Sequence, residues 1–219
     1  MRIDIVFDTV CPWCYVGKRR FDRALAQRPN IVPEIQYRSF LLNPDLPAGG
    51  VNRREFLERK FGSSQQYDRV VEALVHTGKG EGIDFALEKI DRTPNSANSH
   101  RLVRLAQTIG AQGKAVDAIF AAYFERGLDI GDPEVLIRLA VEIGLDKQAA
   151  TTHMLSDGDL NSVFNENARM HRLGVTGVPC YIFNESKAIS GAQEPDIILR
   201  LLDMTATEEA EQPTLQSTG

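Results

Sequence analysis

The stretch RIDIVFDTVCPWC at residues 2–14 decides the fold. Residues 2–7 alternate apolar and polar side chains, with one break on the polar side, which predicts a strand with one well-buried face. Pro12 fits the first turn of a helix, where its missing N–H removes no hydrogen bond, and a basic helix is expected over residues 15–27. The strand and the turn after it are therefore predicted to place Cys11 at the start of a helix.

Cys11 and Cys14 are the strongest functional signal in this stretch. Three positions of separation along a helix put the two sulfurs on one face, close enough to form a disulfide. The unpaired N–H groups and the positive dipole end at a helix start favour a thiolate at Cys11, which is the nucleophile in thiol–disulfide exchange. Cys14, one turn deeper, would resolve the mixed disulfide. Both cysteines are predicted to be catalytic, with Pro12 and Trp13 contacting the substrate.

This cysteine pair has two other interpretations. A zinc site would need further Cys or His ligands at short spacing, but Cys180 is the one other cysteine and no two histidines lie close together in the sequence. A pair of cysteines without function is the second alternative. The strand directly before the pair and the proline inside it favour redox chemistry over both, so no metal ligand is predicted.

The composition excludes several classes of function. The 219 residues carry a net charge of -5 with 42% apolar content, so nucleic acid is not an expected partner. No stretch reaches the roughly 18 uninterrupted apolar residues of a membrane helix, and no membrane partner is expected. The first residues lack the basic, apolar and cleavage regions of a secretory signal. A cytoplasmic location is therefore predicted, where a cysteine pair is more often catalytic than structural.

The rest of the chain predicts a mixed α/β fold. The expected elements after the first helix are a strand over 34–41, five to seven helices over 52–173, a hairpin over 180–190 and a helix over 195–203. A right-handed crossover makes the first two strands parallel, so the fold class is a four-stranded mixed sheet with a large all-helical insertion. The predicted units are a sheet domain at 1–45 and 174–204, an inserted helical domain at 46–173, and a disordered tail at 205–219.

A second motif, Val175-Thr176-Gly177-Val178-Pro179, stands directly before the third strand. A cis bond before Pro179 would turn the backbone of Val178 outward, so that its N–H and C=O could pair with an extended substrate segment. Because cis bonds are rare even before proline, the residues alone favour a trans bond. Val178 and Pro179 are candidate substrate-binding residues.

Several motifs together resemble one known family. They are Phe7-Asp8 with the turn into Cys-Pro-Trp-Cys, the helical insertion, Gly-Val-Thr-Gly-Val-Pro at 174–179 and Ile-Ser-Gly-Ala-Gln at 189–193. Over residues 2–204 the chain resembles the DsbA-like thioredoxin superfamily. Within it, the chain is most similar to the cytoplasmic FrnE-type branch, near the 2-hydroxychromene-2-carboxylate isomerases and the kappa-class glutathione transferases. The resemblance implies a thioredoxin-like fold in which Pro179 is a cis proline facing Cys11.

The cysteine pair and the resemblance predict a thiol–disulfide oxidoreductase that acts on protein or small thiol substrates. The isomerases and kappa-class enzymes carry a serine at the position of Cys11 and lack the second cysteine, so Cys14 favours dithiol chemistry. A glutathione-dependent isomerase or transferase is the alternative, and a non-catalytic chaperone that binds through a groove on the insertion is a further one. No cofactor is required, although glutathione is a candidate co-substrate. A monomer and a homodimer are both left open.

Four further residues are candidates for binding. His100, in a segment that resembles the first helix of the family's lid, is a candidate substrate-binding residue, although a histidine without function is the commoner case. Ser190 and Gly191 are candidate glutathione-binding residues, because free N–H groups there could hold a carboxylate. Asn43 is a third candidate, because its turn is expected beside the same groove.

Asp8 and Cys180 each have two interpretations. A buried carboxylate at Asp8 could relay the proton of the resolving thiol, but a solvated aspartate at the end of a strand is the expected case. Cys180 follows Pro179, where family members usually carry an aromatic or other apolar residue. It is expected to be a buried apolar cysteine, and a third redox site is the alternative.

Overall fold

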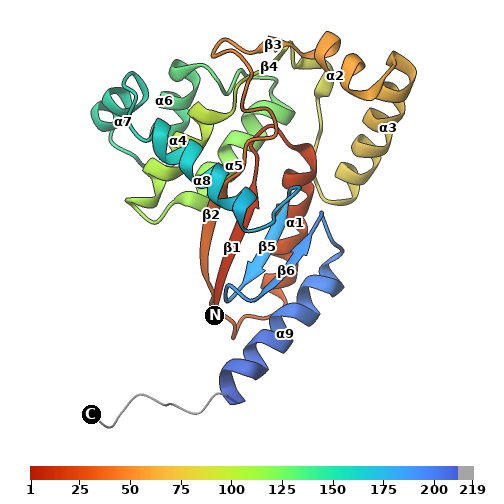
Figure 1. The fold of residues 1–219 in the computed structure, drawn as a ribbon, viewed down its shortest axis with the longest axis vertical. Helices are drawn as coiled ribbons and strands as arrows, with labels where there is room; N and C mark the ends of the chain where they lie inside the picture. The colour runs from red at the N-terminus through yellow and green to blue at the C-terminus, as the bar shows by residue number, and fades with distance from the viewer. Residues whose placement is uncertain (212–219) are drawn as a thin grey trace.

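The computed structural model describes residues 1–211 of the chain. A four-stranded sheet with the order β2-β1-β5-β6 lies at its centre (Figure 1). β1 runs parallel to β2 and antiparallel to β5, and β5 is antiparallel to β6. The strands are β1 Arg2–Phe7, β2 Glu34–Ser39, β5 Cys180–Phe183 and β6 Lys187–Ser190. The predicted mixed sheet is confirmed, and its second strand ends two residues earlier than expected.

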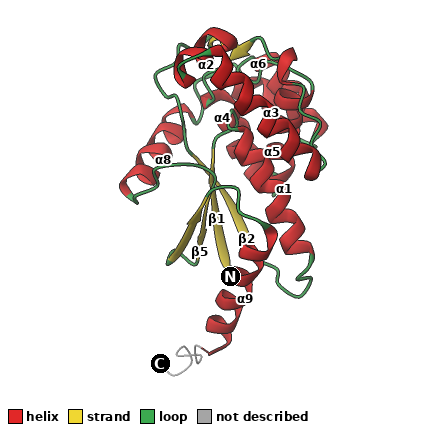
Figure 2. Ribbon diagram, turned by 90° about the vertical axis from the view of Figure 1, so that its right-hand side faces the viewer, coloured by secondary structure: helices red, strands yellow, loops and turns green. Residues whose placement is uncertain are grey.

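Helices cover both faces of this sheet (Figure 2). α1 (Pro12–Ala26) and α9 (Pro195–Glu211) lie on one face, and α8 (Leu160–Arg172) lies on the other. Because side chains alternate along a strand, Tyr181 faces α1, where its ring stacks on Phe21 with centroids 5.4 Å apart. Its neighbour Cys180 faces α8, where it packs with Val6 and Met170. β1 is therefore buried on both faces, which explains the apolar Val6 on the expected polar side.

Between β2 and β5 the chain forms a helical region at one end of the sheet (Figure 1). α4 to α8 pack together on one side of it, and α2 and α3 pack on the other. Seven α-helices occur in this part of the described chain, within the predicted range. They are α2 Arg53–Phe61, α3 Ser64–Gly80, α4 Ala97–Gln107, α5 Gln112–Phe120, α6 Pro133–Glu142, α7 Lys147–Met154 and α8. Through residue 211, no helix combines the length and the apolar character needed to cross a membrane.

Short elements in this region were not predicted. β3 (Val51–Asn52) and β4 (Arg92–Thr93) form an antiparallel pair, η1 (Leu87–Lys89) is a 3₁₀ turn, and η2 (Ala121–Glu125) is a π-helical turn. A two-residue strand has no alternation to detect, and its partner lies far away in the sequence. The pairing fixes where α2 begins relative to α4.

The last helix is longer than the sequence indicated. α9 continues to Glu211, so the predicted disordered tail is wrong for residues 205–211, and its remainder lies outside the described residues. Contacts with other segments account for the extension. Thr205 is buried, the terminal amino group lies 2.8 Å from Glu209, and Glu208 pairs with Lys187. These contacts stabilise a polar helical segment whose composition alone favours disorder.

Candidate active site

Cys11 is the N-cap of α1, with backbone angles of φ -92° and ψ 110°. Its N–H donates to the carbonyl of Asp8 at 3.1 Å, and its own carbonyl accepts from the N–H of Cys14 at 3.0 Å. Pro12 is the first helical residue, as predicted, and Cys11 makes no side-chain capping bond. The turn therefore holds the Cys11 sulfur at the amide-rich end of the helix.

The two thiols lie together and are free. Cys11 is 6% exposed and Cys14 is 2% exposed. Burial raises the pKa of the Cys14 thiol well above its usual value, and the neighbouring Cys11 sulfur raises it further. A backbone hydrogen bond from Asp8 lowers this pKa, whereas the negative carboxylate of Asp8 raises it. Cys14 therefore remains a protonated thiol at neutral pH in the reduced protein.

The segment before β5 faces this dithiol. The Val178–Pro179 peptide bond is cis, not trans, and the Sγ of Cys11 lies 3.9 Å from the carbonyl oxygen of Val178. The carbonyl of Pro179 accepts from the N–H of Gly191 at 2.7 Å, which ties this segment to the end of β6. The structure thus brings together four predicted site residues, Cys11, Val178, Pro179 and Gly191, from distant parts of the chain.

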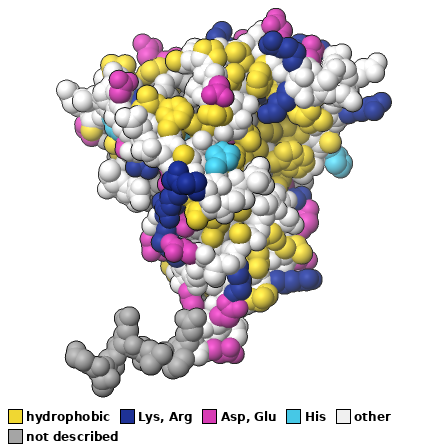
Figure 3. Space-filling model, in the orientation of Figure 1, with side chains coloured by type: hydrophobic (Ala, Val, Ile, Leu, Met, Phe, Trp, Pro, Cys, Tyr) yellow, Lys and Arg dark blue, Asp and Glu magenta, His cyan; other side chains and the backbone are white. Residues whose placement is uncertain are grey.

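The surface beside Cys11 is partly apolar. Trp13 is 39% exposed, and Pro12 is half-buried. Apolar side chains gather between α1 and α3 on the face shown in Figure 3, and Phe61 and Leu42 are also partly exposed. An apolar substrate segment could contact this surface when its sulfur reaches Cys11.

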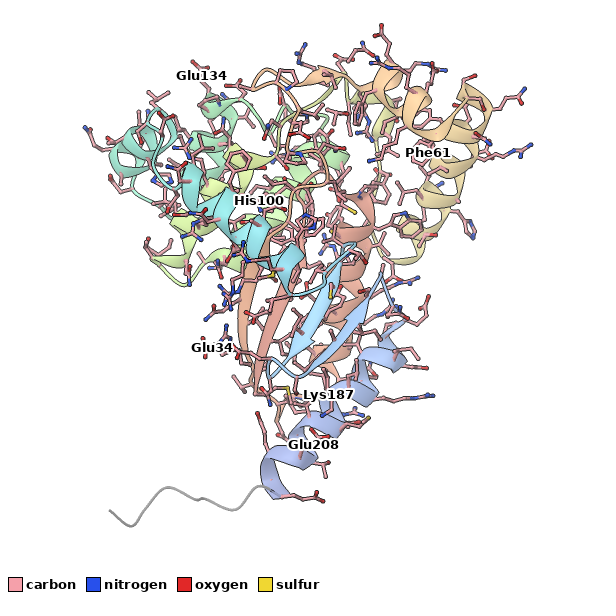
Figure 4. The ribbon with its side chains drawn as sticks, viewed as in Figure 1. Glu34, Phe61, His100, Glu134, Lys187 and Glu208 are labelled. Atoms are coloured by element: carbon pink, nitrogen blue, oxygen red, sulfur yellow. The ribbon has the colours of Figure 1, made fainter. Side chains whose placement is uncertain are left out.

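Asp8 and His100 differ from expectation. Both side chains are fully buried, and His100 Nε2 lies 3.4 Å from Asp8 Oδ1. Asp8 also accepts from the N–H of Leu42 at 2.7 Å. The expected solvated position of Asp8 is wrong, because the loop after β2 and helix α4 close over it. His100, labelled in Figure 4, reaches no open surface, so its predicted direct contact with substrate is wrong as well.

The candidate glutathione-binding residues are not gathered at one point. Gly191 lies next to Pro179, and Ser190 is exposed beside it. Asn43 instead accepts a hydrogen bond from Lys60 of α2 at 3.4 Å. Cys180 lies on the opposite sheet face from α1, buried among apolar side chains. Burial raises the pKa of the Cys180 thiol, and the nearby Ser190 hydroxyl opposes this effect.

Gly17 is a site residue that the sequence interpretation missed. A Cβ at Gly17 would lie 2.9 Å from Cγ of Pro179 and 2.5 Å from the hydroxyl of Tyr181, so only glycine lets α1 approach the cis proline this closely. The available signal was an isolated glycine inside a predicted helix, which usually has a packing reason.

Solved structures share this fold over most of the chain. A probable DsbA oxidoreductase from Streptomyces coelicolor is 30% identical, with a TM-score of 0.85, and the match covers 95% of this chain and 91% of that one. A cytosolic disulfide reductase, DsbM from Pseudomonas aeruginosa, solved with GSH, is 17% identical with a TM-score of 0.68, covering 94% and 100%. A 2-hydroxychromene-2-carboxylate isomerase is 16% identical with a TM-score of 0.69, covering 96% and 98%. The last two show similarity of fold alone.

The family model described as the DSBA-like thioredoxin domain matches residues 2–203. This range includes the cysteine pair, the whole helical insertion and the cis proline. The match agrees with the observed four-stranded mixed sheet and with the family that the sequence motifs resemble. The chain belongs to the DsbA-like thioredoxin family, with a thioredoxin-like fold interrupted by a large helical insertion.

Proposed function

We propose that this protein is a thiol–disulfide oxidoreductase that exchanges disulfides with protein or small thiol substrates through Cys11 and Cys14. The observation that carries the proposal is the position of Cys11 at the start of α1, with its Sγ 3.9 Å from the carbonyl of Val178. Membership in the DsbA-like family supports the same class of chemistry.

The two cysteines have different tasks in this proposal. Cys11, at the amide-rich start of α1, attacks a substrate disulfide R–S–S–R′ as a thiolate and releases R′–S⁻. The raised pKa of the buried Cys14 keeps that thiol out of the first step. Cys14 then attacks the Cys11–S–S–R bond, releasing R–S⁻ and leaving a Cys11–Cys14 disulfide. The reverse sequence oxidises a substrate dithiol, and the reduction potential of the pair sets the direction.

The surroundings of Cys11 support two kinds of substrate. An extended peptide could pair with the backbone of Val178 and cover the apolar surface that includes Trp13. Glutathione is the small-thiol candidate, since DsbM was solved with GSH and the Gly191 backbone adjoins Pro179. We place the exchange in the cytoplasm, where the glutathione pool is reducing.

The test is reduction of insulin with glutathione or dithiothreitol as electron donor. Cys11→Ser is expected to abolish turnover, because the attacking sulfur is gone. Cys14→Ser is expected to accumulate a mixed disulfide with substrate, which mass spectrometry detects at Cys11. Cys180→Ser is the matched control, because Cys180 lies on the other sheet face, and it should retain turnover.

Two results would contradict the proposal. The first is full insulin reduction by Cys11→Ser. The second is a Cys14→Ser protein that forms no mixed disulfide yet turns over an electrophile with glutathione as fast as the unmodified chain. That second result would instead favour a glutathione-dependent isomerase or transferase, which needs no resolving cysteine.

A further inference from the structure

The two strands at the margins of the sheet, β2 and β6, have different outer edges. In β2 the even-numbered residues pair with β1, because the N–H of Glu34 donates to the carbonyl of Met1. The odd-numbered N–H groups therefore point outward, and side chains of the inserted helices accept their hydrogen bonds. The three bonds are Tyr37 to Gln112 at 3.4 Å, Ser39 to Glu166 at 2.8 Å and, just past the strand, Leu41 to Asn167 at 2.8 Å. This edge is thus closed to a further strand.

The outer edge of β6 has no such cover. The N–H of Gly191 donates to the carbonyl of Pro179 at 2.7 Å, so residues 187, 189 and 191 pair with β5 and residues 188 and 190 point outward. The Ser190 carbonyl accepts from the side chain of Gln193 at 2.7 Å. Within residues 1–211, the N–H and C=O of Ala188 and the N–H of Ser190 have no hydrogen-bond partner, and both residues are exposed. Such a row of unpaired backbone groups is a template for another strand.

A cavity of about 400 Å³ opens beside this edge, on the sheet face opposite α1. α8 packs over β2 on this face and leaves β6 uncovered (Figure 1). Side chains of β5 and β6 form the floor of the cavity, and the end of α8 forms a wall. These side chains include Cys180, Ile182, Ala188, Ser190, Arg169 and Leu173. A strand added to β6 would point alternate side chains into this cavity.

The charged side chains that line the cavity are paired, with one exception. The pairs are Asp4 with Arg2 and Arg38, Glu185 with Arg2, Arg38 also with Glu166, and Lys187 with Glu208. Arg169 of α8 is exposed and makes no ion pair in the described part of the chain. Figure 3 shows a row of basic side chains on this face. The cavity therefore has one positive charge that an acidic side chain would pair.

A second copy of this chain fits the edge poorly. Pairing of β6 with β6 about a two-fold axis at Ala188 sets Lys187 opposite the Ile189 of the second copy. The two Lys187 side chains then lie diagonally on one face, about 7–8 Å apart, where their like charges oppose the pairing. The other register, with Ala188 opposite Ser190, needs the Ser190 carbonyl that Gln193 occupies. β6 also carries no acidic side chain for Arg169.

We propose that the outer edge of β6 and the cavity beside it bind an extended acidic segment of another polypeptide. The segment adds to the sheet as a fifth strand and places an acidic side chain next to Arg169. The backbone of Ala188 and the N–H of Ser190 supply the hydrogen bonds, and the cavity supplies the preference for an acid. The site uses no atom of Cys11 or Cys14, so the inference goes beyond the proposed function and does not depend on it.

The test measures binding of a fluorescein-labelled hexapeptide, in which glutamate and valine alternate, to the full chain by fluorescence anisotropy. The expected Kd is below about 1 mM. A peptide with lysine in place of glutamate should bind at least about tenfold more weakly, although the net charge of the chain is -5 and attracts it. Two further peptides carry N-methyl groups on one or the other set of alternate residues. One should lose binding and the other keep it, because a strand uses every second N–H toward one neighbour.

Variants of the chain locate the site. Ala188→Pro removes an outward N–H at an edge position where proline is tolerated, and it should weaken binding by at least about tenfold. Arg169→Glu should weaken binding by about fivefold to tenfold, because an attractive pair becomes a repulsive one. Arg172→Glu is the matched control, since Arg172 is exposed on the same helix outside the cavity, and it should change Kd by less than about twofold. By NMR, the amide protons of Ala188 and Ser190 should exchange more slowly when the glutamate peptide is bound.

Each outcome bears on the inference. Binding weaker than about 1 mM, equal affinity for the lysine peptide, or a Kd that Ala188→Pro leaves unchanged would overturn it. If Ala188→Pro does not fold, an Arg169→Glu protein with the Kd of the unmodified chain overturns it equally, as does unchanged amide exchange at Ala188. Sedimentation of the chain without peptide examines the second copy as occupant. A dimer that Ala188→Pro dissociates would assign the edge to self-association and overturn the inference.

Discussion

Gly17 of α1 and Tyr181 of β5 pack so closely that no side chain fits between them. A Cβ on Gly17 would lie 2.5 Å from the Tyr181 hydroxyl. That hydroxyl is buried with no hydrogen-bond partner in residues 1–211, so the contact depends on shape alone. This approach holds the helix that begins after Cys11 against the strand that follows Pro179, and it sets the distance between the two halves of the candidate site.

Gly17→Ala is expected to lower the free energy of unfolding by up to about 2 kcal/mol, because overpacking costs about 1–3 kcal/mol and the better helix propensity of alanine offsets about 1 kcal/mol of that cost. Urea unfolding measures the change. Gly113→Ala in α5 is the control, since its Cβ would meet nothing closer than the Tyr37 hydroxyl at 3.6 Å, and it should be neutral or stabilising. A Gly17→Ala protein as stable as the Gly113→Ala protein would contradict this account.

Lys18 is a buried cation, one turn after Cys14. Burial alone would lower its pKa, but Tyr37, Asp22 and Asp117 raise it above the ordinary lysine value. The ammonium lies 2.7 Å from Asp22 and 2.9 Å from Asp117, and both carboxylates are partly exposed. Lys18→Met should therefore cost about 2 kcal/mol, less than the 3–5 kcal/mol of a fully buried pair.

Lys187→Met is the control for Lys18→Met. Lys187 pairs with Glu208 at the surface, and such a pair contributes at most about 1 kcal/mol. Both variants remove one lysine charge, so the difference between their unfolding free energies in urea isolates the effect of burial. Equal losses of unfolding free energy in the two variants would show that the burial of Lys18 adds nothing to the stability of the fold.

The sequence predicted the parts of the fold that local patterns encode. Alternation in residues 2–7 and Pro12 place Cys11 at a helix start, and the 180–190 hairpin follows from its turn. The burial of Asp8 was not predictable in this way, because it depends on Leu42 and His100, which are distant in the sequence. The same reason applies to α9, where contacts with the terminal amino group and Lys187 extend a helix whose composition favours disorder.

Cys180 is expected to take no part in exchange. Burial raises its pKa, so little thiolate forms, and its face of the sheet is separate from that of α1. Cys180→Ala should leave unchanged the rate at which the folded protein releases thiol from the disulfide DTNB through Cys11 and Cys14. In the unmodified chain, a third thiol should react only after denaturation in guanidinium. A mixed disulfide at Cys180 in the folded protein, found by peptide mass spectrometry, would contradict this prediction.

Stability should fall steeply above pH 10 because of buried tyrosines. Burial, with Glu125 adding to it, raises the pKa of Tyr15 to about 12, and burial raises that of Tyr37 to about 12. Unfolded tyrosine ionises near pH 10, so between pH 10 and 12 the unfolded chain loses protons that the folded chain retains. Each such phenol lowers the unfolding free energy by about 1.4 kcal/mol per pH unit, and Lys18 acts in the same direction.

Tyr37→Phe removes one of these phenols, so the unfolding free energy should fall less steeply with pH, by about 1.4 kcal/mol per pH unit. Urea unfolding measured from pH 9 to about 11.5, with reductant present, tests this. The partly exposed Tyr67 provides the Tyr67→Phe control, and identical slopes in the two variants would show that Tyr37 ionises as readily in the folded chain as in the unfolded one.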